Sequence, residues 1–206
     1  MTFTARRLYR RIRFGRPIVV VSGLPRSGTS MAMRMLEAGG MPVLTDAARP
    51  ADEDNPLGYF EHARVLTLDK GGDTAWLAGA RGKALKIVSA LLPHLPETFQ
   101  YKVIFMQRDL REVLASQDRM LARRGERGAG AADDRMIDLY EAHLRKIANL
   151  LRRRRCFQTL EVRYGDVIAD PDGQAHRMNA FLGGRLDPGA MAAAVSSKLY
   201  RHRAHG

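Results

Sequence analysis

The sequence lacks the features that mark several large protein classes. Its 206 residues include one cysteine, Cys156, which excludes a disulfide framework within the chain and a cysteine-based metal site. His62, His94 and His143 show no metal-ligand spacing and are interpreted as surface or capping residues. No apolar run approaches the ~20 residues that span a bilayer, and the apolar stretch 18–21 is too short for a secretory signal. We therefore expect a soluble protein in the cytoplasm, without a membrane span.

Lysine is also scarce. Only six of the 34 basic residues are lysines, and the rest are arginines, whose planar guanidinium group forms bidentate contacts with phosphate-like oxyanions. The net charge is +12, although codon bias explains an arginine-rich composition equally well. Basic and aromatic residues are not interleaved, so the pattern does not predict a nucleic-acid partner.

Short apolar segments alternate with helical patterns along the chain. Strands are predicted over residues 17–22, 84–89, 102–107 and 160–164, and helices over residues 29–38, 109–123 and 136–155. Asp109, Asp170 and Asp187 are predicted to cap helices. The alternation predicts an α/β protein, a P-loop NTPase-like three-layer fold with a mostly parallel central sheet. Residues 1–206 are expected to form a single domain, with a basic arm over residues 1–16.

The segment from Gly23 to Ser30, Gly-Leu-Pro-Arg-Ser-Gly-Thr-Ser, joins the first predicted strand to the first helix. Backbone N–H groups in such a turn converge on an anion, and the helix amino terminus adds positive charge. The glycine spacing is that of the nucleoside-triphosphate P-loop, but Thr29 replaces the lysine and the cation lies earlier, at Arg26. A neighbouring strand ends in Arg108, where NTPases usually place an acidic magnesium ligand. The pattern favours two oxyanion sites over a magnesium site.

Two segments together resemble those of sulfotransferases that use 3′-phosphoadenosine-5′-phosphosulfate (PAPS). Pro25-Arg-Ser-Gly-Thr-Ser30 is similar to their 5′-phosphosulfate loop and is shared, as far as the threonine, with tyrosylprotein sulfotransferases. The segment 103–116 resembles their 3′-phosphate segment, in which an arginine ends a strand and a serine follows eight residues later. Arg108 and Ser116 match that spacing. The resemblance extends over roughly residues 17–190, including a lysine on a strand and a later Tyr-containing segment.

This resemblance implies transfer of a sulfonate group from PAPS to a hydroxyl or amine acceptor, without a metal and with adenosine 3′,5′-bisphosphate as the product. It implies that the cofactor binds to Arg26, Ser27, Gly28, Thr29, Ser30, Arg108, Ser116 and Tyr164. Arg26 and Lys86 are the candidates for stabilising charge on the leaving phosphate. The sequence leaves open the oligomeric state and whether the acceptor is a small molecule, a glycan or a peptide.

The general base is less clearly marked. Cytosolic sulfotransferases place a histidine two residues after the strand lysine, where this chain has Val88. In tyrosylprotein sulfotransferases a glutamate base and an arginine lie in the loop after the first helix. Asp46 falls one residue short of that glutamate, and Arg49 coincides with that arginine. We therefore expect Asp46 to be the base and Glu61 to be its rival, while solvated loop residues without a catalytic role are the alternative.

Two other functions stay open. A P-loop kinase or NTPase would be identified by magnesium-dependent ATP hydrolysis. A non-catalytic nucleotide-binding protein would keep the fold without a general base. Val88 is consistent with this function, because it stands where the cytosolic sulfotransferases have a histidine. The Arg-Lys-Gly segment near the carboxyl end of the family is not recognisable, and Lys198, Tyr200 and Arg201 are candidates for part of its role.

Overall fold

The structure is a computed structural model that describes residues 15–46, 60–123, 125–126 and 133–195. Four residues named above, Arg49, Lys198, Tyr200 and Arg201, lie outside these ranges. No helix in the described ranges is both long and apolar enough to cross a membrane.

Four parallel strands form one sheet in the order β2–β1–β3–β4. They are β1 (Ile18–Gly23), β2 (Ala84–Val88), β3 (Tyr101–Gln107) and β4 (Phe157–Arg163). All residues of β1 are buried, which explains its apolar run over residues 18–21, because a central parallel strand is covered on both faces. Parallel strands end at the same edge of a sheet, so the segments that follow β1, β2 and β3 meet there.

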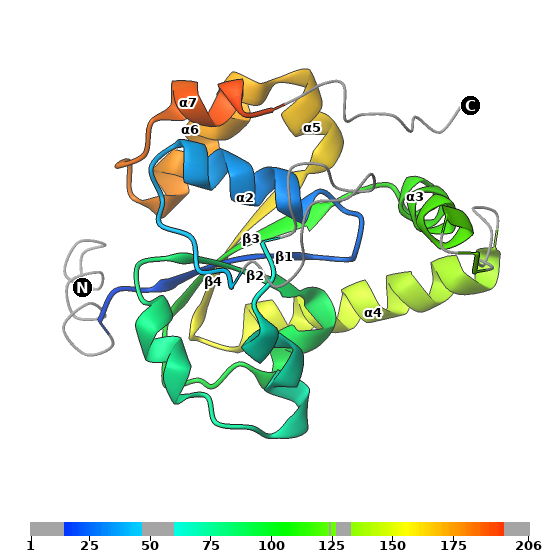
Figure 1. Cartoon of the computed structure of the whole chain (residues 1–206), viewed down its shortest axis with the longest axis horizontal. Helices are drawn as coiled ribbons and strands as arrows, with labels where there is room; N and C mark the ends of the chain where they lie inside the picture. The colour runs from blue at the N-terminus through cyan, green and yellow to red at the C-terminus, as the bar shows by residue number, and fades with distance from the viewer. Residues whose placement is uncertain (1–14, 47–59, 124, 127–132, 196–206) are drawn as a thin grey trace.

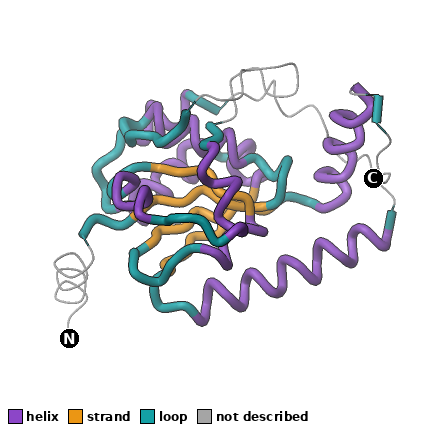
Figure 2. Tube along the Cα trace, turned by 60° about the horizontal axis from the view of Figure 1, so that its bottom comes forward, coloured by secondary structure: helices purple, strands orange, loops and turns teal. Residues whose placement is uncertain are grey.

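Helices cover both faces of the sheet and complete the predicted three layers (Figure 1). One face carries α2 (Thr29–Ala38), α5 (Tyr164–Ala169), α6 (Pro171–Leu182) and α7 (Pro188–Ala193). The other carries α4 (Asp134–Arg153) and the 3-10 helices η1 (Ala63–Lys70), η2 (Ala75–Ala80) and η3 (Ser89–His94). The helix α3 (Leu110–Arg123) and the first turns of α4 extend beyond the sheet (Figure 2). The three 3-10 helices were not predicted.

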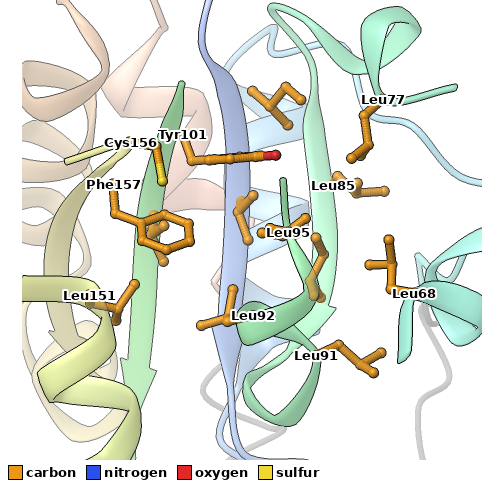
Figure 3. Packing of buried hydrophobic residues seen from close by; sticks show 14 of the residues in the cluster. Leu68, Leu77, Leu85, Leu91, Leu92, Leu95, Tyr101, Leu151, Cys156 and Phe157 are labelled. Atoms are coloured by element: carbon orange, nitrogen blue, oxygen red, sulfur yellow. The ribbon is translucent and has the colours of Figure 1, made fainter. Parts of the chain in front are cut away.

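The strand side chains alternate between two apolar cores. The core on the α4 face includes Leu85 of β2, Tyr101 of β3, Phe157 of β4 and Leu92 of η3 (Figure 3). The Tyr101 and Phe157 rings lie 5.3 Å apart, and the Tyr101 hydroxyl donates to the Pro96 carbonyl oxygen at 2.9 Å. This burial anchors the amino ends of β3 and β4, at the edge of the sheet opposite to the site described below.

Most predicted boundaries agree with the structure within two residues, and β4 is the exception. It begins at Phe157, three residues before the predicted start, and Tyr164 is the first residue of α5 instead of the last of the strand. The prediction was wrong because the edge strand β4 exposes polar residues, such as Thr159 and Glu161, which interrupt its apolar pattern.

The three predicted helix caps are confirmed. Asp109 Oδ1 accepts a hydrogen bond from the Glu112 N–H at 3.1 Å. Asp170 and Asp187 accept equivalent bonds at 2.9 and 3.1 Å, each with a proline at the first helical position. These caps satisfy N–H groups that have no partner inside the helix, so they mark the start of each helix.

Candidate active site

The turn between β1 and α2 depends on two glycines with positive φ angles. Gly23 ends β1 with φ 153°, and a Cβ atom there would lie 2.6 Å from the Met106 carbonyl oxygen. Gly28 is the N-cap of α2 with φ 98°, and a Cβ atom there would lie 2.5 Å from Cδ2 of Tyr164. The close approach of β3 and Tyr164 therefore requires glycine at both positions. The loop ends at the first turn of α2, whose N–H groups are suited to binding an anion.

Arg26 lies at the tip of this loop in a left-handed conformation, φ 69°, which is uncommon for a residue with a side chain. The neighbouring Ser27 is buried, and its Oγ donates to the Leu24 carbonyl oxygen at 2.7 Å. The Nε atom of Arg26 donates to Oγ of the buried Ser116 at 3.0 Å. Strained backbone conformations of this kind cluster at functional sites, where the surrounding structure maintains them.

Arg108 follows β3 and contacts the same loop. Its Nη1 donates to the Arg26 carbonyl oxygen at 3.2 Å, and its Nε donates to Oε2 of Glu112 at 2.9 Å. Its Cζ lies 4.5 Å from the centre of the Tyr164 ring, within cation–π range. The structure therefore brings the two segments predicted to bind separate anions into one cluster, which contains Arg26, Arg108, Ser116 and Tyr164.

Lys86 lies on β2, in register with Val21 of β1. Its Nζ is 3.8 Å from Oε1 of Glu61, and the two side chains are 10% and 32% exposed. The Glu61 carbonyl oxygen accepts hydrogen bonds from the Asp46 N–H at 3.2 Å and from the Thr45 hydroxyl at 2.8 Å. The backbone around Glu61 is thus anchored, and its carboxylate is placed beside Lys86.

Asp46 has a different environment. Its side chain is exposed, and Oδ2 accepts a hydrogen bond from the N–H of Ala63 at the start of η1. This bond makes Asp46 a cap for η1 supplied by a distant segment. The carboxylate of the other candidate base, Glu61, is paired with Lys86, a candidate catalytic cation.

A cavity of about 370 Å³ lies between α4 and the carboxyl ends of β3 and β4. Much of its wall is apolar, including Phe105 and Leu144, while Arg145 and Glu161 add charge. Arg108 contributes to the cavity as well as to the cluster above, so the cavity adjoins the candidate site. In the described part of the chain, no three His, Cys, Asp or Glu side chains are grouped so that they could hold a metal ion.

A model of the sulfotransferase family matches residues 46–188, which is more than half of the chain. The chain belongs to the sulfotransferase family. The matched region includes Lys86, Arg108, Ser116 and Tyr164. The matched region begins after the loop that contains Arg26. The interpretation of that loop as an anion-binding loop therefore rests on its geometry and its motif. A search of curated protein sequences found no match.

Solved sulfotransferase structures share the fold of this sulfotransferase-family chain. Sulfotransferase STF1 from Mycobacterium tuberculosis H37Rv has a TM-score of 0.56 and 16% identity, over 98% of this chain and 75% of that chain. The sulfotransferase domain from the curacin biosynthetic pathway has a TM-score of 0.50 and 15% identity, over 88% of this chain and 83% of that chain. These similarities confirm the predicted fold class.

Two side-chain contacts in the structure were not predicted. Glu112 pairs with Arg108, and the side chains of Glu112 and Arg108 are 11% and 8% exposed. His143, interpreted as a surface or capping residue, is half-buried on α4, and its Nε2 lies 2.8 Å from Oγ of Ser89. Burial lowers the pKa of His143, and Lys146 lowers it further. No sequence pattern signals the Ser89–His143 contact, because the residues are 54 positions apart on different elements.

Proposed function

We propose that this chain transfers a sulfonate group from PAPS to a hydroxyl or amine acceptor. The proposal rests on the two hydrogen bonds that connect Arg26 with Ser116 and Arg108 with the Arg26 carbonyl oxygen. PAPS carries anionic groups on both its 5′ and its 3′ side, so it needs two cationic binding segments held at a constant separation. A nucleoside triphosphate, in contrast, is usually bound by the loop after β1 together with a magnesium ion held by an acidic residue, and a neighbouring strand here is followed by Arg108 instead.

The candidate binding residues form two groups, one for the 5′ side and one for the 3′ side of PAPS. The 5′-phosphosulfate group is assigned to the loop Arg26–Ser30, through backbone N–H groups and the hydroxyls of Thr29 and Ser30. The 3′-phosphate is assigned to Arg108 and Ser116, since arginine pairs well with phosphate oxygens. Tyr164 is assigned to the adenosine side of the site, where its ring also supports Arg108.

The transfer is an in-line displacement at sulfur. A bond forms between the acceptor and sulfur while the bond from sulfur to the bridging oxygen breaks, and that oxygen leaves with the 5′-phosphate. Negative charge develops on the leaving phosphate, and the cations of Arg26 and Lys86 are proposed to stabilise it. Side-chain cations provide this stabilisation, so we propose that the reaction is metal-independent.

The acceptor must also lose a proton, and we propose Glu61 as the general base, ahead of Asp46. Glu61 lies beside Lys86, on the strand adjacent to β1 and its anion loop. The Asp46 carboxylate instead accepts the Ala63 N–H and stabilises η1. Proton transfer to Glu61 would take place beside Lys86, the cation proposed to act on the leaving phosphate.

Calorimetry tests the nucleotide assignment. Adenosine 3′,5′-bisphosphate, 5′-AMP and ATP are titrated into the full chain, with and without EDTA. We expect the bisphosphate to bind roughly tenfold or more tightly than 5′-AMP, because it gains charge-assisted bonds to Arg108. EDTA should not change this affinity. Binding of ATP alone, or strict magnesium dependence, would contradict the proposal.

Turnover tests the catalytic assignment. PAPS is incubated with the chain and a panel that contains a phenol, a primary alcohol and an amine, and product formation is followed by mass spectrometry. We expect at least one acceptor class to be sulfonated faster than PAPS is hydrolysed. If the bisphosphate binds and no acceptor reacts, the non-catalytic nucleotide-binding function gains support.

A further inference from the structure

A carboxylate lies inside the proposed 3′-phosphate site. Glu112 is in the first turn of α3, and its side chain is 11% exposed beside that of Arg108, which is 8% exposed. A negative charge at this position repels a bound phosphate group, and the repulsion is stronger where water is excluded. The Glu112 carboxylate therefore weakens phosphate binding at the proposed site unless another effect of this side chain compensates for the repulsion.

Three contacts hold the Arg108 guanidinium from different directions. Its Nε donates to Glu112 at 2.9 Å, and its Nη1 donates to the Arg26 carbonyl oxygen at 3.2 Å. Its Cζ lies over the Tyr164 ring, at 4.5 Å from the ring centre. A guanidinium group that is already oriented loses less conformational entropy when a ligand binds, and it presents its donors in a fixed geometry.

We propose that Glu112 is a positioning residue that holds Arg108 in the orientation that selects a 3′-phosphate over a 3′-hydroxyl. The inference rests on the proposed function, because it assigns donor selectivity to the same site. Glu112 acts through its hydrogen bond to Arg108 Nε. The contribution of Glu112 to the selectivity for a 3′-phosphate depends on the length of its side chain, and its negative charge alone is not sufficient for that selectivity.

A second pair with the same spacing provides a control. Glu141 and Arg145 on α4 are also four residues apart, with Arg145 Nη1 at 3.2 Å from Glu141 Oε2. Their side chains are 51% and 68% exposed, compared with 11% and 8% for the Glu112–Arg108 pair. Exposed pairs contribute little because water screens them. Substitutions at Glu141 therefore control for the general effect of altering a carboxylate in an i, i+4 pair.

The experiment separates the reach of the Glu112 side chain from its charge. Glu112→Gln keeps an oxygen that can accept from Arg108 Nε but removes the negative charge. Glu112→Asp keeps the charge but shortens the side chain by one methylene group. Selectivity is measured by calorimetry as the ratio of the dissociation constants of 5′-AMP and adenosine 3′,5′-bisphosphate. Glu141→Gln and Glu141→Asp are measured alongside, and unfolding midpoints are recorded for every variant.

We expect Glu112→Asp to lower the selectivity ratio roughly 10- to 100-fold, the effect of losing one charge-assisted hydrogen bond. Glu112→Gln should keep the ratio or raise it, because the bond to Arg108 stays and the repulsion is removed. The Glu141 variants should match the wild type.

Two results would overturn the inference. One is an unchanged ratio in Glu112→Asp, with or without a loss of stability, because Glu112 would then only support the start of α3. The other is an equal loss in the Asp and Gln variants, because charge would then matter instead of reach. A wild-type chain that does not distinguish the two nucleotides would instead reject the proposed function, so the two failures are distinguishable.

Discussion

The Nε atom of Arg26 donates a hydrogen bond to Oγ of Ser116 at 3.0 Å, across 90 positions of the sequence. Arg26 belongs to the loop after β1, and Ser116 is a buried residue of α3. Arg108 also donates to the Arg26 carbonyl oxygen, so two hydrogen bonds connect the proposed 5′ and 3′ binding segments. A change in either segment is therefore expected to affect the binding of groups on both sides of the nucleotide.

Ser116→Ala tests this connection. The substitution removes a buried acceptor of the Arg26 guanidinium, and we expect the bisphosphate to bind about 1.5–3 kcal/mol more weakly, the range for hydrogen bonds to charged groups. Binding of 5′-AMP should weaken too, because Arg26 belongs to the 5′ segment. Thr67→Ala removes an exposed hydroxyl bonded to the Arg64 carbonyl oxygen and serves as the control. Unchanged 5′-AMP affinity in Ser116→Ala would contradict the coupling.

Arg108→Ala removes the proposed partner of the 3′-phosphate. We expect the bisphosphate to bind more weakly by about 1.5–3 kcal/mol. The effect on 5′-AMP should be smaller, because 5′-AMP has no 3′-phosphate. Arg111→Ala, at a side chain that is 56% exposed, should leave both affinities unchanged. If Arg108→Ala discriminates the two nucleotides as well as the wild type does, the assignment of Arg108 is wrong.

Gly28→Ala should destabilise the chain. The new Cβ atom would lie 2.5 Å from Cδ2 of Tyr164, and φ 98° is unfavourable for alanine, so we expect a loss of about 1–3 kcal/mol in the free energy of unfolding. Displacement of Tyr164 should also disturb Arg108 and weaken bisphosphate binding. Gly165 on α5 has open space around it, and Gly165→Ala should leave stability unchanged or raise it by up to about 1 kcal/mol. Chemical denaturation measures both variants.

The two carboxylate candidates are distinguished by isosteric variants. Glu61→Gln should lower turnover on the order of 10²-fold while bisphosphate affinity stays nearly unchanged, because a general base acts on the acceptor proton and not on cofactor binding. Asp46→Asn should have a smaller effect on turnover, since its carboxylate caps η1. The reverse result would restore Asp46 as the base, in agreement with the sequence-based prediction. If neither variant reduces turnover, neither carboxylate is the base.

His143 should make the stability of the chain depend on pH. Burial, reinforced by Lys146, lowers its pKa in the folded chain, so between the folded and unfolded pKa values the unfolded chain binds more protons. Stability is therefore fully present above the unfolded value, ~6.5, and is lost as pH falls through the folded value. Denaturation between about pH 5 and pH 7.5 should show this loss in the wild type and a smaller loss in His143→Gln. His176→Gln, at an exposed position on α6, should behave like the wild type.

Much of the fold was predictable because its signals are local. β1 has an apolar run over residues 18–21, α2 has the predicted bounds, and Asp170 and Asp187 cap their helices. β4 was harder to predict, because this edge strand exposes the polar side chains of Gln158, Thr159, Glu161 and Arg163, and its pairing with β3 compensates for the weak pattern. The 3-10 helices were missed because short turns of this type carry no clear periodicity.

By itself, the sequence determined the class of fold and located the two motifs that we propose bind anions. Each motif depends on a few neighbouring residues, such as the glycines around Arg26 or the eight-residue step from Arg108 to Ser116. Only the tertiary structure decided how they combine. The Arg26–Ser116 bond and the placement of Glu61 beside Lys86 join residues that are distant in sequence. The segments that follow parallel strands lie at the same edge of the sheet, and the packing of the chain then determines which side chains come into contact there.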